Sequence, residues 1–595
     1  MKKHVVWGIL IVSFVLFSLA PMFYELSQKE KLSGRTFEPV HNYVTDYNFY
    51  LSRIREGMEG RWTVVERYTS EPHRGSFIQI FYLLLGKPAS VFSNKIIGAT
   101  MAYHTARVLC GLLFLFLVVR TVQRTFHPFL WQILGFLIVV TAGSIPIIVW
   151  LPESWPPGTD ILRTLGGFRF GMYMSWWTVM DSLQRMTFLP HILFGQSLMV
   201  FLLGDLFDWN RRLYKYSLMV KFFSAFILGM VFPPGFLFVG ATYGVMSVLE
   251  FLFEPRECLR SKPHRAVWFR DSLIPRISVI SGGIPTLLYY SFMLTLVPWR
   301  RLIEFDVLNP TWFPLPEYGL AIGPVLLFGT IGALVSLIQK KKQMVVFVSW
   351  IIAWAVLLFV FTHIPQQSAL RFTEVAVQVP LGILTVYLFY QIWCVSIIRS
   401  PCLAGLPARF IQRARAFPLL ALSIGKIFSL TVPILLIVLG LGIMYCSYLW
   451  QKDFVNQKVA AGWPAVPMKN VMVYPITGFT DALAFIEKHT PEDAVILSDL
   501  TAGNYIPSHS GKTVFVGHDN TFAKEKKLLD TERFYKGEMN QGQAYAWLSQ
   551  NRITYVFFGP QEREWGEDIA ALYPFLREVY KNNDVTVYFI PAGLQ

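Results

Sequence analysis

The stretch QMVVFVSWIIAWAVLLFVFT, residues 343–362, decides the fold class, because it contains no charged residue over its whole length. A helix of that length matches the hydrocarbon core of a bilayer, and in lipid a helix satisfies its own backbone hydrogen bonds. Similar runs recur along the 595-residue chain, which is 54% hydrophobic and has a mean hydropathy of +0.44. The sequence therefore predicts an α-helical polytopic membrane protein.

About eleven transmembrane helices are predicted from these apolar runs. They are expected at residues 5–24, 95–119, 129–150, 187–206, 217–233, 235–253, 274–298, 318–339, 343–362, 376–397 and 428–449. Little more than Pro233-Pro234 separates the fifth from the sixth, which predicts either a tight hairpin or one broken helix. The apolar run 77–85 is too short to span, and we expect it to lie along the interface or to re-enter.

Lys and Arg in the short loops predict the orientation, because cytoplasmic loops are enriched in these residues. With the N-terminus inside, 19 of them fall in the inner segments and 6 in the short outer loops. This predicts a multi-pass plasma-membrane protein whose first long loop, residues 25–75, and C-terminal tail lie outside. The asymmetry also explains much of the net charge of +15, so nucleic acid is not expected as a partner. The first span is interpreted as a retained anchor rather than a signal peptide.

The chain becomes polar after about residue 450, which predicts a transmembrane domain over 1–450 and an extracytoplasmic α/β domain over 451–595. Within the tail, Gly503-Asn504 and Gly511-Lys512 are interpreted as turns. Strands are expected at 494–497, 513–516, 554–558 and 585–590, and helices at 480–488 and 544–551.

The first outer loop is the densest group of charges in the chain, with eight acids and eight Lys or Arg between residues 25 and 74. Within it, Asp46 is followed by Tyr47 and Tyr50, which together with Tyr43 would share one face of a helix. A carboxylate at the membrane surface can accept a proton from an acceptor hydroxyl. Asp46 equally suits the N-cap of a helix that begins at Tyr47. The local pattern leaves both roles open.

Two other features of this loop have a functional and a plain interpretation. Arginines, Arg53 among them, alternate with acids such as Glu66, which is also typical of a solvated amphipathic helix. In Glu71-Pro-His73-Arg74-Gly75, Pro and Gly bracket three functional groups just before the chain returns to the interface. Such a segment can bind phosphate or a metal ion, but one histidine makes His73 only a weak candidate metal ligand.

A further candidate lies in the outer loop 362–374. Arg371 is its only basic residue and directly precedes the next span, at the depth of a lipid phosphate. The planar fork of guanidinium donors suits phosphate. The alternatives are that Arg371 snorkels to the interface or pairs with Glu374.

These residues support a resemblance. A first span followed by a long outer loop with Asp46-Tyr47, about ten further spans, an arginine before a span and an α/β tail resembles the bacterial membrane glycosyltransferases of the GT-C superfamily. The similarity is detailed in residues 45–60, 71–86 and 491–517, the last leading into His518. Elsewhere it concerns architecture alone.

The resemblance implies an inverting hexosyl or pentosyl transferase. Its donor would be a polyprenyl-phosphate-linked sugar, and its acceptor a glycan, lipid or protein outside the cytoplasm. The position of Asp46 implies that it is the base. Many members have two acids close together here, whereas the nearest acids to Asp46 are Glu38 and Glu56, so the base is alternatively one of two others, Glu66 and Glu71.

The resemblance also implies that basic residues hold the leaving phosphate. Arg371 matches best, followed by Arg74 and Arg53. No cofactor is implied with certainty, and a divalent metal stays open.

Two other classes of function remain. A transporter would carry charged residues at mid-membrane and paired broken helices, and these spans are nearly free of both. A non-catalytic scaffold with a degenerate site would keep the charged loop merely to pack against the tail.

Overall fold

The computed structural model describes most of the chain. The described residues are 3–40, 44–145, 147–150, 164–165, 168–174, 176–204, 214–253, 268–309, 313–395, 419–468, 471–566 and 568–591. By its internal contacts the chain divides into two compact units. We call residues 1–20, 107–287 and 310–450 the helical unit, and residues 21–106, 288–309 and 451–595 the mixed unit.

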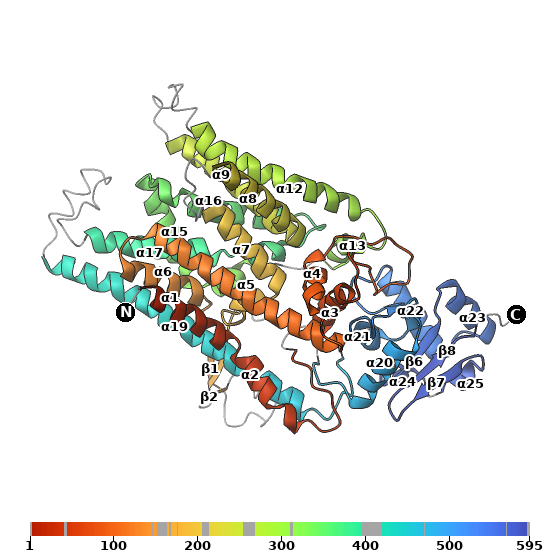
Figure 1. The fold of residues 1–595 in the computed structure, drawn as a ribbon. Helices are drawn as coiled ribbons and strands as arrows, with labels where there is room; N and C mark the ends of the chain where they lie inside the picture. Colours follow the sequence, from red (N-terminus) through yellow and green to blue (C-terminus); the bar gives the residue numbers. More distant parts are fainter. Residues whose placement is uncertain are drawn as a thin grey trace. The chain divides into compact units, whose positions relative to one another are not determined.

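Long apolar helices form the helical unit, several of them continuing into the mixed unit. The helices, in chain order, are α1 (Lys3–Ser18), α5 (Lys95–Thr125), α6 (Phe129–Thr141), α7 (Pro190–Gly204), α8 (Tyr214–Val231), α9 (Pro233–Phe253), α12 (Ile274–Met293), α14 (Leu315–Ile322), α15 (Pro324–Ile338), α16 (Val345–Phe361), α17 (Gln378–Val395) and α19 (Leu419–Ala460). Figure 1 shows these helices. A short antiparallel sheet, β1 (Ile147–Trp150), β3 (Phe168–Gly171) and β2 (Thr164–Leu165), belongs to the same unit.

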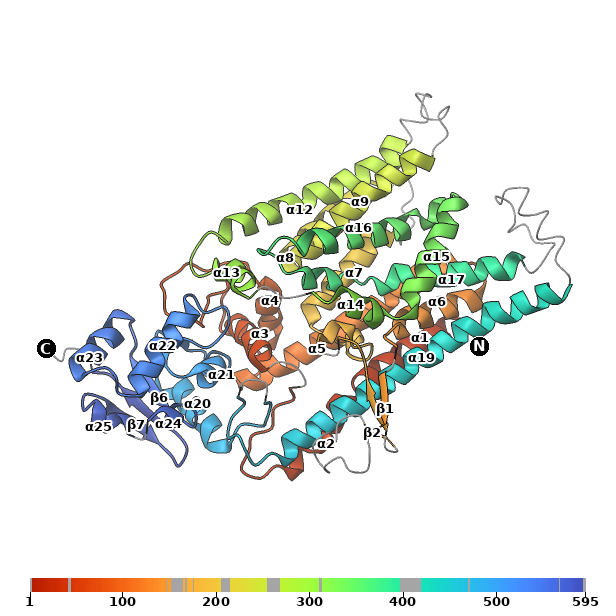
Figure 2. The same cartoon turned by 180° about the vertical axis from the view of Figure 1, so that it is seen from behind.

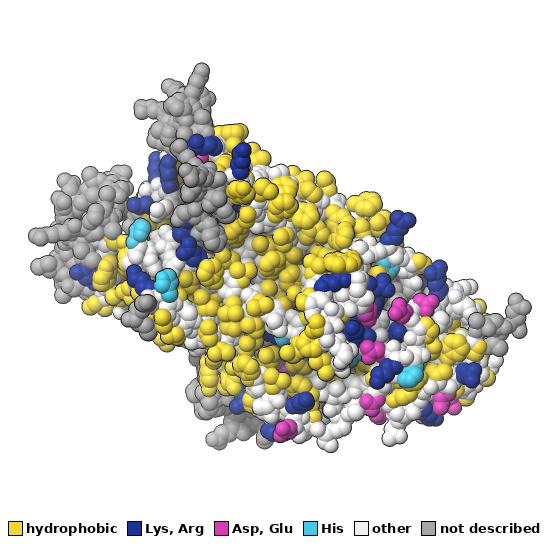
Figure 3. All heavy atoms as spheres, viewed as in Figure 1, with side chains coloured by type: hydrophobic (Ala, Val, Ile, Leu, Met, Phe, Trp, Pro, Cys, Tyr) yellow, Lys and Arg dark blue, Asp and Glu magenta, His cyan; other side chains and the backbone are white. Residues whose placement is uncertain are grey.

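Within the described residues, five helices are long and apolar enough to cross a membrane, and two bent helix pairs raise the number to seven. Four shorter apolar helices, α4 (Ile80–Ala89), α6, α7 and α17, add to these. The predicted helical class is therefore confirmed, whereas the number of eleven spans stays a prediction. Figure 3 shows hydrophobic side chains over much of the visible face of the helical unit, as expected for helices that face lipid.

The spans predicted at 129–150 and 318–339 differ in detail, whereas the break expected at Pro233-Pro234 is present. The span expected at 129–150 is helical only to Thr141 and ends in strand β1. The span expected at 318–339 is two helices, α14 and α15, bent by 84° where Gly323 takes a φ of +79° that favours glycine. At Pro233 the chain forms two helices, α8 and α9, because a proline fits the first turn of a new helix but interrupts a continuing one.

The mixed unit contains a five-stranded sheet of order β5-β4-β6-β8-β7. β4 (Val495–Leu497) pairs in parallel with β5 (Thr513–Val514) and β6 (Tyr555–Phe558), whereas β8 (Thr586–Phe589) pairs antiparallel with β6 and β7 (Arg577–Lys581). Helices α20 (Thr477–His489), α21 (Leu500–Ser510), α22 (Lys524–Tyr535) and α23 (Gln541–Gln550) accompany it, with the short α24 (Glu562–Trp565) and α25 (Ile569–Leu572). Figure 2 shows this sheet from the opposite side.

The expected strands and helices of the tail are confirmed, with one wrong turn. Gly503-Asn504 lies inside α21, which begins where the Asp499 side chain accepts a hydrogen bond from the N–H of Leu500. This N-cap places the start of the helix before Gly503, so Gly503 is a helical residue and not part of a turn. The other expected turn is present, since Gly511 ends α21 with a φ of +73°.

The first outer loop contains helix α3 (Val44–Met58), which packs against the helix that follows the loop, α4 (Ile80–Ala89). Gly57 and Gly86 let their backbones approach closely: a Cβ on Gly57 would lie 1.9 Å from the carbonyl oxygen of Leu83, and one on Gly86 would lie 1.9 Å from that of Ile54. α3 also packs against α21 of the tail. Helix α3 is thereby held between α4 and α21. It carries the residues of the candidate site.

Candidate active site

The site is built on the first turn of α3. Asp46 lies in this turn, where the positive end of the helix dipole favours a carboxylate, and its side chain is 54% exposed. The helix begins at Val44 rather than at the predicted Tyr47, so Asp46 is a helical residue and not the N-cap. Tyr47 and Tyr50 share one face of α3, since both contact the ring of Tyr103. The third tyrosine of the predicted face, at position 43, lies outside the described residues.

A histidine of the tail faces Asp46. The Nε2 atom of His518 lies 3.5 Å from Oδ1 of Asp46. The His518 ring stacks on Phe49, one turn after Asp46 on α3, with a centroid distance of 4.3 Å and an angle of 13° between the rings. An exposed carboxylate and a buried imidazole therefore meet on one side of α3.

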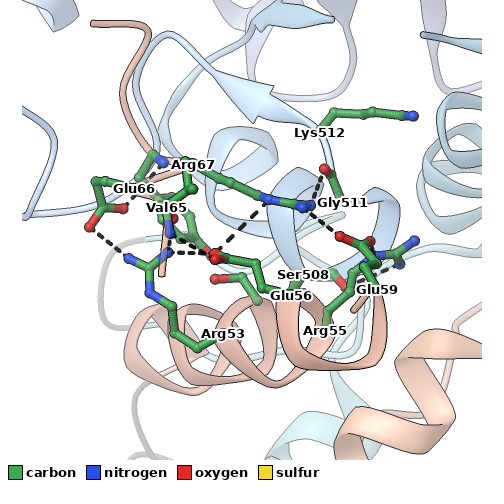
Figure 4. Close-up of polar contacts among 12 residues, drawn as sticks. Arg53, Arg55, Glu56, Glu59, Val65, Glu66, Arg67, Ser508, Gly511 and Lys512 are labelled. Atoms are coloured by element: carbon green, nitrogen blue, oxygen red, sulfur yellow. Dashed lines mark hydrogen bonds and ion pairs between the residues drawn. The ribbon is translucent and has the colours of Figure 1, made fainter. Parts of the chain in front are cut away.

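Further along α3, Arg53 is fully buried among acceptors (Figure 4). Its Nη2 donates to Glu66 at 2.6 Å and its Nη1 to Glu56 at 3.0 Å, while Nε donates to Gln79 at 3.0 Å. Burial opposes the charge of Arg53, but the carboxylates of Glu66 and Glu56 outweigh it and raise the pKa of the guanidinium. Two sequence candidates, Arg53 and Glu66, are thus brought together as an ion pair.

The same cluster extends from α3 to the tail. Arg67 donates to Glu59 and to the carbonyl of Gly511, as Figure 4 shows. Arg55 donates to Glu59 at 2.8 Å and to Glu487 of α20 at 2.6 Å. Burial opposes ionisation of Glu59, but Arg67 and Arg55 outweigh it and lower the pKa of this carboxyl. The loop and the tail of the mixed unit are therefore joined by charge-assisted hydrogen bonds.

The side chains of the segment from Glu71 to Gly75 differ in their hydrogen bonds and ion pairs. Glu71 accepts a hydrogen bond from Thr69 and pairs with Lys527 of α22 at 2.8 Å. Nε2 of His73 accepts from the backbone N–H of Glu66 at 2.8 Å, and its Nδ1 donates to the Glu71 carbonyl at 2.7 Å. Arg74 is exposed and has no hydrogen bond or ion pair to the rest of the described chain.

The structure offers no support for a metal at His73. Both of its ring nitrogens are used by backbone groups, as described above. In the described ranges no group of three or more His, Cys, Asp or Glu side chains is arranged to hold a metal ion. A divalent metal accordingly stays an open expectation.

Arg371 belongs to the helical unit. It lies in a 3₁₀ turn, Ala369–Glu374, its side chain is 47% exposed, and Nη1 lies 3.7 Å from Oε1 of Glu374. Burial raises the pKa of Glu374 to about 7, with Arg371 opposing the shift, and Oε2 of Glu374 has no hydrogen-bond partner in the described part of the chain. Arg371 therefore lies beside Glu374, the partner that the sequence left as an alternative. Its guanidinium is also partly exposed.

Sequence reasoning assigned no role to His518. A signal existed, because His518 follows soon after the parallel strand β5, and residues beyond the carboxyl ends of parallel strands often line sites in α/β sheets. The signal is weak, because the partner of His518 lies on α3, hundreds of residues earlier.

Comparison with known proteins identifies the fold. Neither a family model nor a curated protein matches the sequence. The crystal structure of the Archaeoglobus fulgidus oligosaccharyltransferase in the apo form matches over 99% of this chain and 75% of that chain, with 13% identity and a TM-score of 0.50. The A. fulgidus oligosaccharyltransferase AglB in complex with an inhibitory peptide and a dolichol-phosphate matches over the same shares with 12% identity and a TM-score of 0.49. ArnT from Cupriavidus metallidurans bound to undecaprenyl phosphate matches over 98% of this chain and 99% of that chain, with 13% identity and a TM-score of 0.49. The match to the apo oligosaccharyltransferase, at a TM-score of 0.50, indicates a shared fold, and identities this low transfer no residue roles.

Proposed function

We propose that this chain, which has the fold of the GT-C membrane glycosyltransferases, moves a hexosyl or pentosyl group from a polyprenyl-phosphate donor to an acceptor outside the cytoplasm, with inversion and with Asp46 as base. One observation carries the proposal. Asp46 is an exposed carboxylate on a helix whose other charged groups are buried and paired. It is therefore accessible to an acceptor while the helix that carries it is held rigidly.

The contacts favour Asp46 over the two alternative bases. Glu66 is buried and accepts a hydrogen bond from Arg53, and its removal would leave that guanidinium partly unpaired. Glu71 is held by Lys527 and Thr69. A base must be reachable by the hydroxyl that it deprotonates, and Asp46 is the most exposed of the three carboxylates.

The proposed step is a single displacement. A carboxylate oxygen of Asp46 takes the proton of the acceptor hydroxyl as the hydroxyl oxygen forms a bond to the anomeric carbon. The bond from that carbon to the phosphate oxygen breaks, and polyprenyl phosphate leaves with the bonding electrons. One displacement inverts the configuration, which is the outcome that the resemblance to the family implies.

Cations would stabilise the charge that develops on the leaving phosphate. We propose Arg371 for this role, because it matches the family pattern best and its guanidinium, whose planar fork of donors suits phosphate, is half exposed. Arg74, exposed and unpaired in the described part of the chain, is the second candidate. Arg53 is the weakest of the three, since each of its nitrogens already donates to an acceptor within the mixed unit.

We also propose that the reaction takes place outside the cytoplasm, as the distribution of Lys and Arg predicts. In a variant without native cysteines, a cysteine at Ser70 or at the exposed Lys526 should react with an impermeant thiol reagent in intact cells. A cysteine at the exposed Lys342 should not react. The reverse labelling pattern would overturn the orientation.

The donor class is tested on the purified protein. Mass spectrometry of the detergent extract should identify a co-purifying isoprenoid phosphate. The protein should then release undecaprenyl phosphate from one member of a panel of undecaprenyl-phosphate hexoses and pentoses, in the presence of an extract of cell-envelope lipids and glycans as acceptors. A non-catalytic scaffold is expected to carry no bound isoprenoid lipid and to release undecaprenyl phosphate from none of the donors. That result would contradict the proposal.

A further inference from the structure

His518 has one polar atom that the fold leaves unsatisfied. The residue is only 5% exposed, and among the described residues its Nε2 has no hydrogen-bond partner. The nearest acceptor recorded for this atom is Oδ1 of Asp46 at 3.5 Å, just longer than a hydrogen bond. A buried polar atom normally finds a partner, so an atom left without one and facing a candidate base requires a reason.

The other ring nitrogen fixes the tautomer. Nδ1 of His518 accepts a hydrogen bond from the backbone N–H of Asn520 at 3.1 Å. A nitrogen that accepts carries no proton, so in the neutral ring the proton is assigned to Nε2. The group that faces Asp46 is therefore an N–H donor.

The ring is also held in place on several sides. It stacks on Phe49 and lies at a centroid distance of 5.4 Å from Tyr68. The hydroxyl of Thr521 accepts from the backbone N–H of His518 at 3.2 Å and donates to the carbonyl of Tyr68 at 2.7 Å. The direction of the Nε2–H group is thus set by the packing of the tail against α3.

We propose that His518 is a positioning residue for Asp46. Its Nε2–H donates to Oδ1 of Asp46 in the reacting complex, and this leaves Oδ2 oriented to receive the proton of the acceptor hydroxyl. The inference rests on the proposed function, in which Asp46 is the base. The observed 3.5 Å fits this role, because catalytic hydrogen bonds are often long before substrate binds and tighten in the reacting complex.

Two substitutions separate positioning from simple packing. The amide of Asn lies at the level of the Nδ1 atom of histidine, so His518→Asn can keep the contact to Asn520 but loses the donor to Asp46. The amide of Gln lies at the level of Nε2, so His518→Gln can keep the donor. His518→Phe keeps the stack on Phe49 and loses both nitrogens.

The experiment measures release of undecaprenyl phosphate from the panel donor that the parent protein turns over. For His518→Asn and His518→Phe we expect a loss of about tenfold or more in kcat with KM little changed, as for removal of a hydrogen bond to a charged group made in the transition state. His518→Gln should retain activity within about threefold. Thermal unfolding in detergent checks that each variant is folded.

Double variants distinguish the two levels of the proposal. In an Asp46→Asn background, His518→Asn should cause little further loss, because the group it positions is gone. No turnover of any panel donor would refute the proposed transfer reaction. A silent Asp46→Asn variant would refute Asp46 as the base, and with it the role of His518. A strong loss in Asp46→Asn with His518→Asn as active as the parent would refute only the role of His518. Equal losses in folded His518→Asn and His518→Gln would likewise show that the ring merely packs.

Discussion

The charged side chains at the two ends of helix α3 differ in exposure and in hydrogen bonding. In the first turn Asp46 is exposed, and its Oδ1 lies 3.5 Å from Nε2 of His518. About two turns further on, Arg53 and Glu56 are fully buried and bonded to each other at 3.0 Å. Both ends look alike in the sequence, as charges among aromatic and aliphatic residues. The difference teaches that charge density alone does not identify chemistry, whereas unsatisfied hydrogen-bonding capacity at an accessible position does.

The buried end has a structural task. Buried charges cost free energy unless they are paired, so such a cluster contributes a defined arrangement more than stability. Arg55 reaches Glu487. Figure 4 shows that Arg67 reaches the carbonyl of Gly511. A Cβ on Gly511 would lie 2.6 Å from Glu59 and 2.7 Å from Arg55, and the φ of +73° favours glycine at this position. The cluster holds the tail on α3, and the tail brings His518 to Asp46.

The largest effect is expected from breaking the buried end. Arg53→Ala would leave Glu56 and Glu66 buried without their main cation, at a cost of about 3–5 kcal/mol in the free energy of unfolding. Thermal or denaturant unfolding in detergent measures the change, and the exposed Arg61→Ala is the matched control, expected to be near neutral. An Arg53→Ala variant of parental stability with weakened binding of undecaprenyl phosphate would instead restore Arg53 as a phosphate ligand.

The exposed end should respond in rate rather than in stability. Asp46→Asn keeps the size of the side chain and removes the basic carboxylate, so we expect a loss on the order of a hundredfold or more in transfer rate. Its unfolding midpoint should match that of the parent. Glu66→Gln should mainly lower stability, and Glu71→Gln should change both quantities less. If Asp46→Asn is silent and one of the glutamine variants is folded but inactive, the base lies at that glutamate.

Arg371 extends the comparison to a cation that is half exposed and lies 3.7 Å from Glu374. Arg371→Ala should weaken binding of undecaprenyl phosphate by roughly tenfold, the value of a hydrogen bond to a charged group. Arg371→Lys should weaken binding less, because the charge remains and the planar fork is lost. Arg74→Ala serves as the parallel variant. Parental affinity in Arg371→Ala would leave Arg371 as an interfacial anchor or a partner of Glu374.

The last prediction concerns the pH dependence of stability at Glu374, a buried carboxyl that lies 3.7 Å from the guanidinium of Arg371. Its pKa is raised to about 7 by burial, so folding favours its protonated form. The stability that it contributes is therefore complete below the unfolded pKa of about 4.5 and is lost as the pH rises through 7. Glu374→Gln should raise the unfolding midpoint more at pH 8 than at pH 5. An equal change at both values would show that the carboxyl does not titrate in this window.

The sequence by itself determined the features that depend on local composition and periodicity. Apolar runs predicted the helical class, and alternating patterns located β4, β6 and β8. This works because the order of apolar and polar residues in an element reflects which of its faces is buried. The same patterns missed β7, Arg577–Lys581, which is a charged and mostly exposed strand at the edge of the sheet. They also singled out Asp46 and Arg371, whose exposure is consistent with the proposed roles.

Only the tertiary structure decided which charged groups have their hydrogen-bonding partners within the protein and which are exposed to a substrate. Arg53 and Glu66 were separate candidates in the sequence and are partners in the fold, and His518 acquired a role only when the tail placed its ring on Phe49. The physical reason is that hydrogen bonding and desolvation depend on neighbours in space, which residues hundreds of positions apart supply. The approach of the Nε2 atom of His518 to Asp46 is therefore not visible from the loop that carries Asp46.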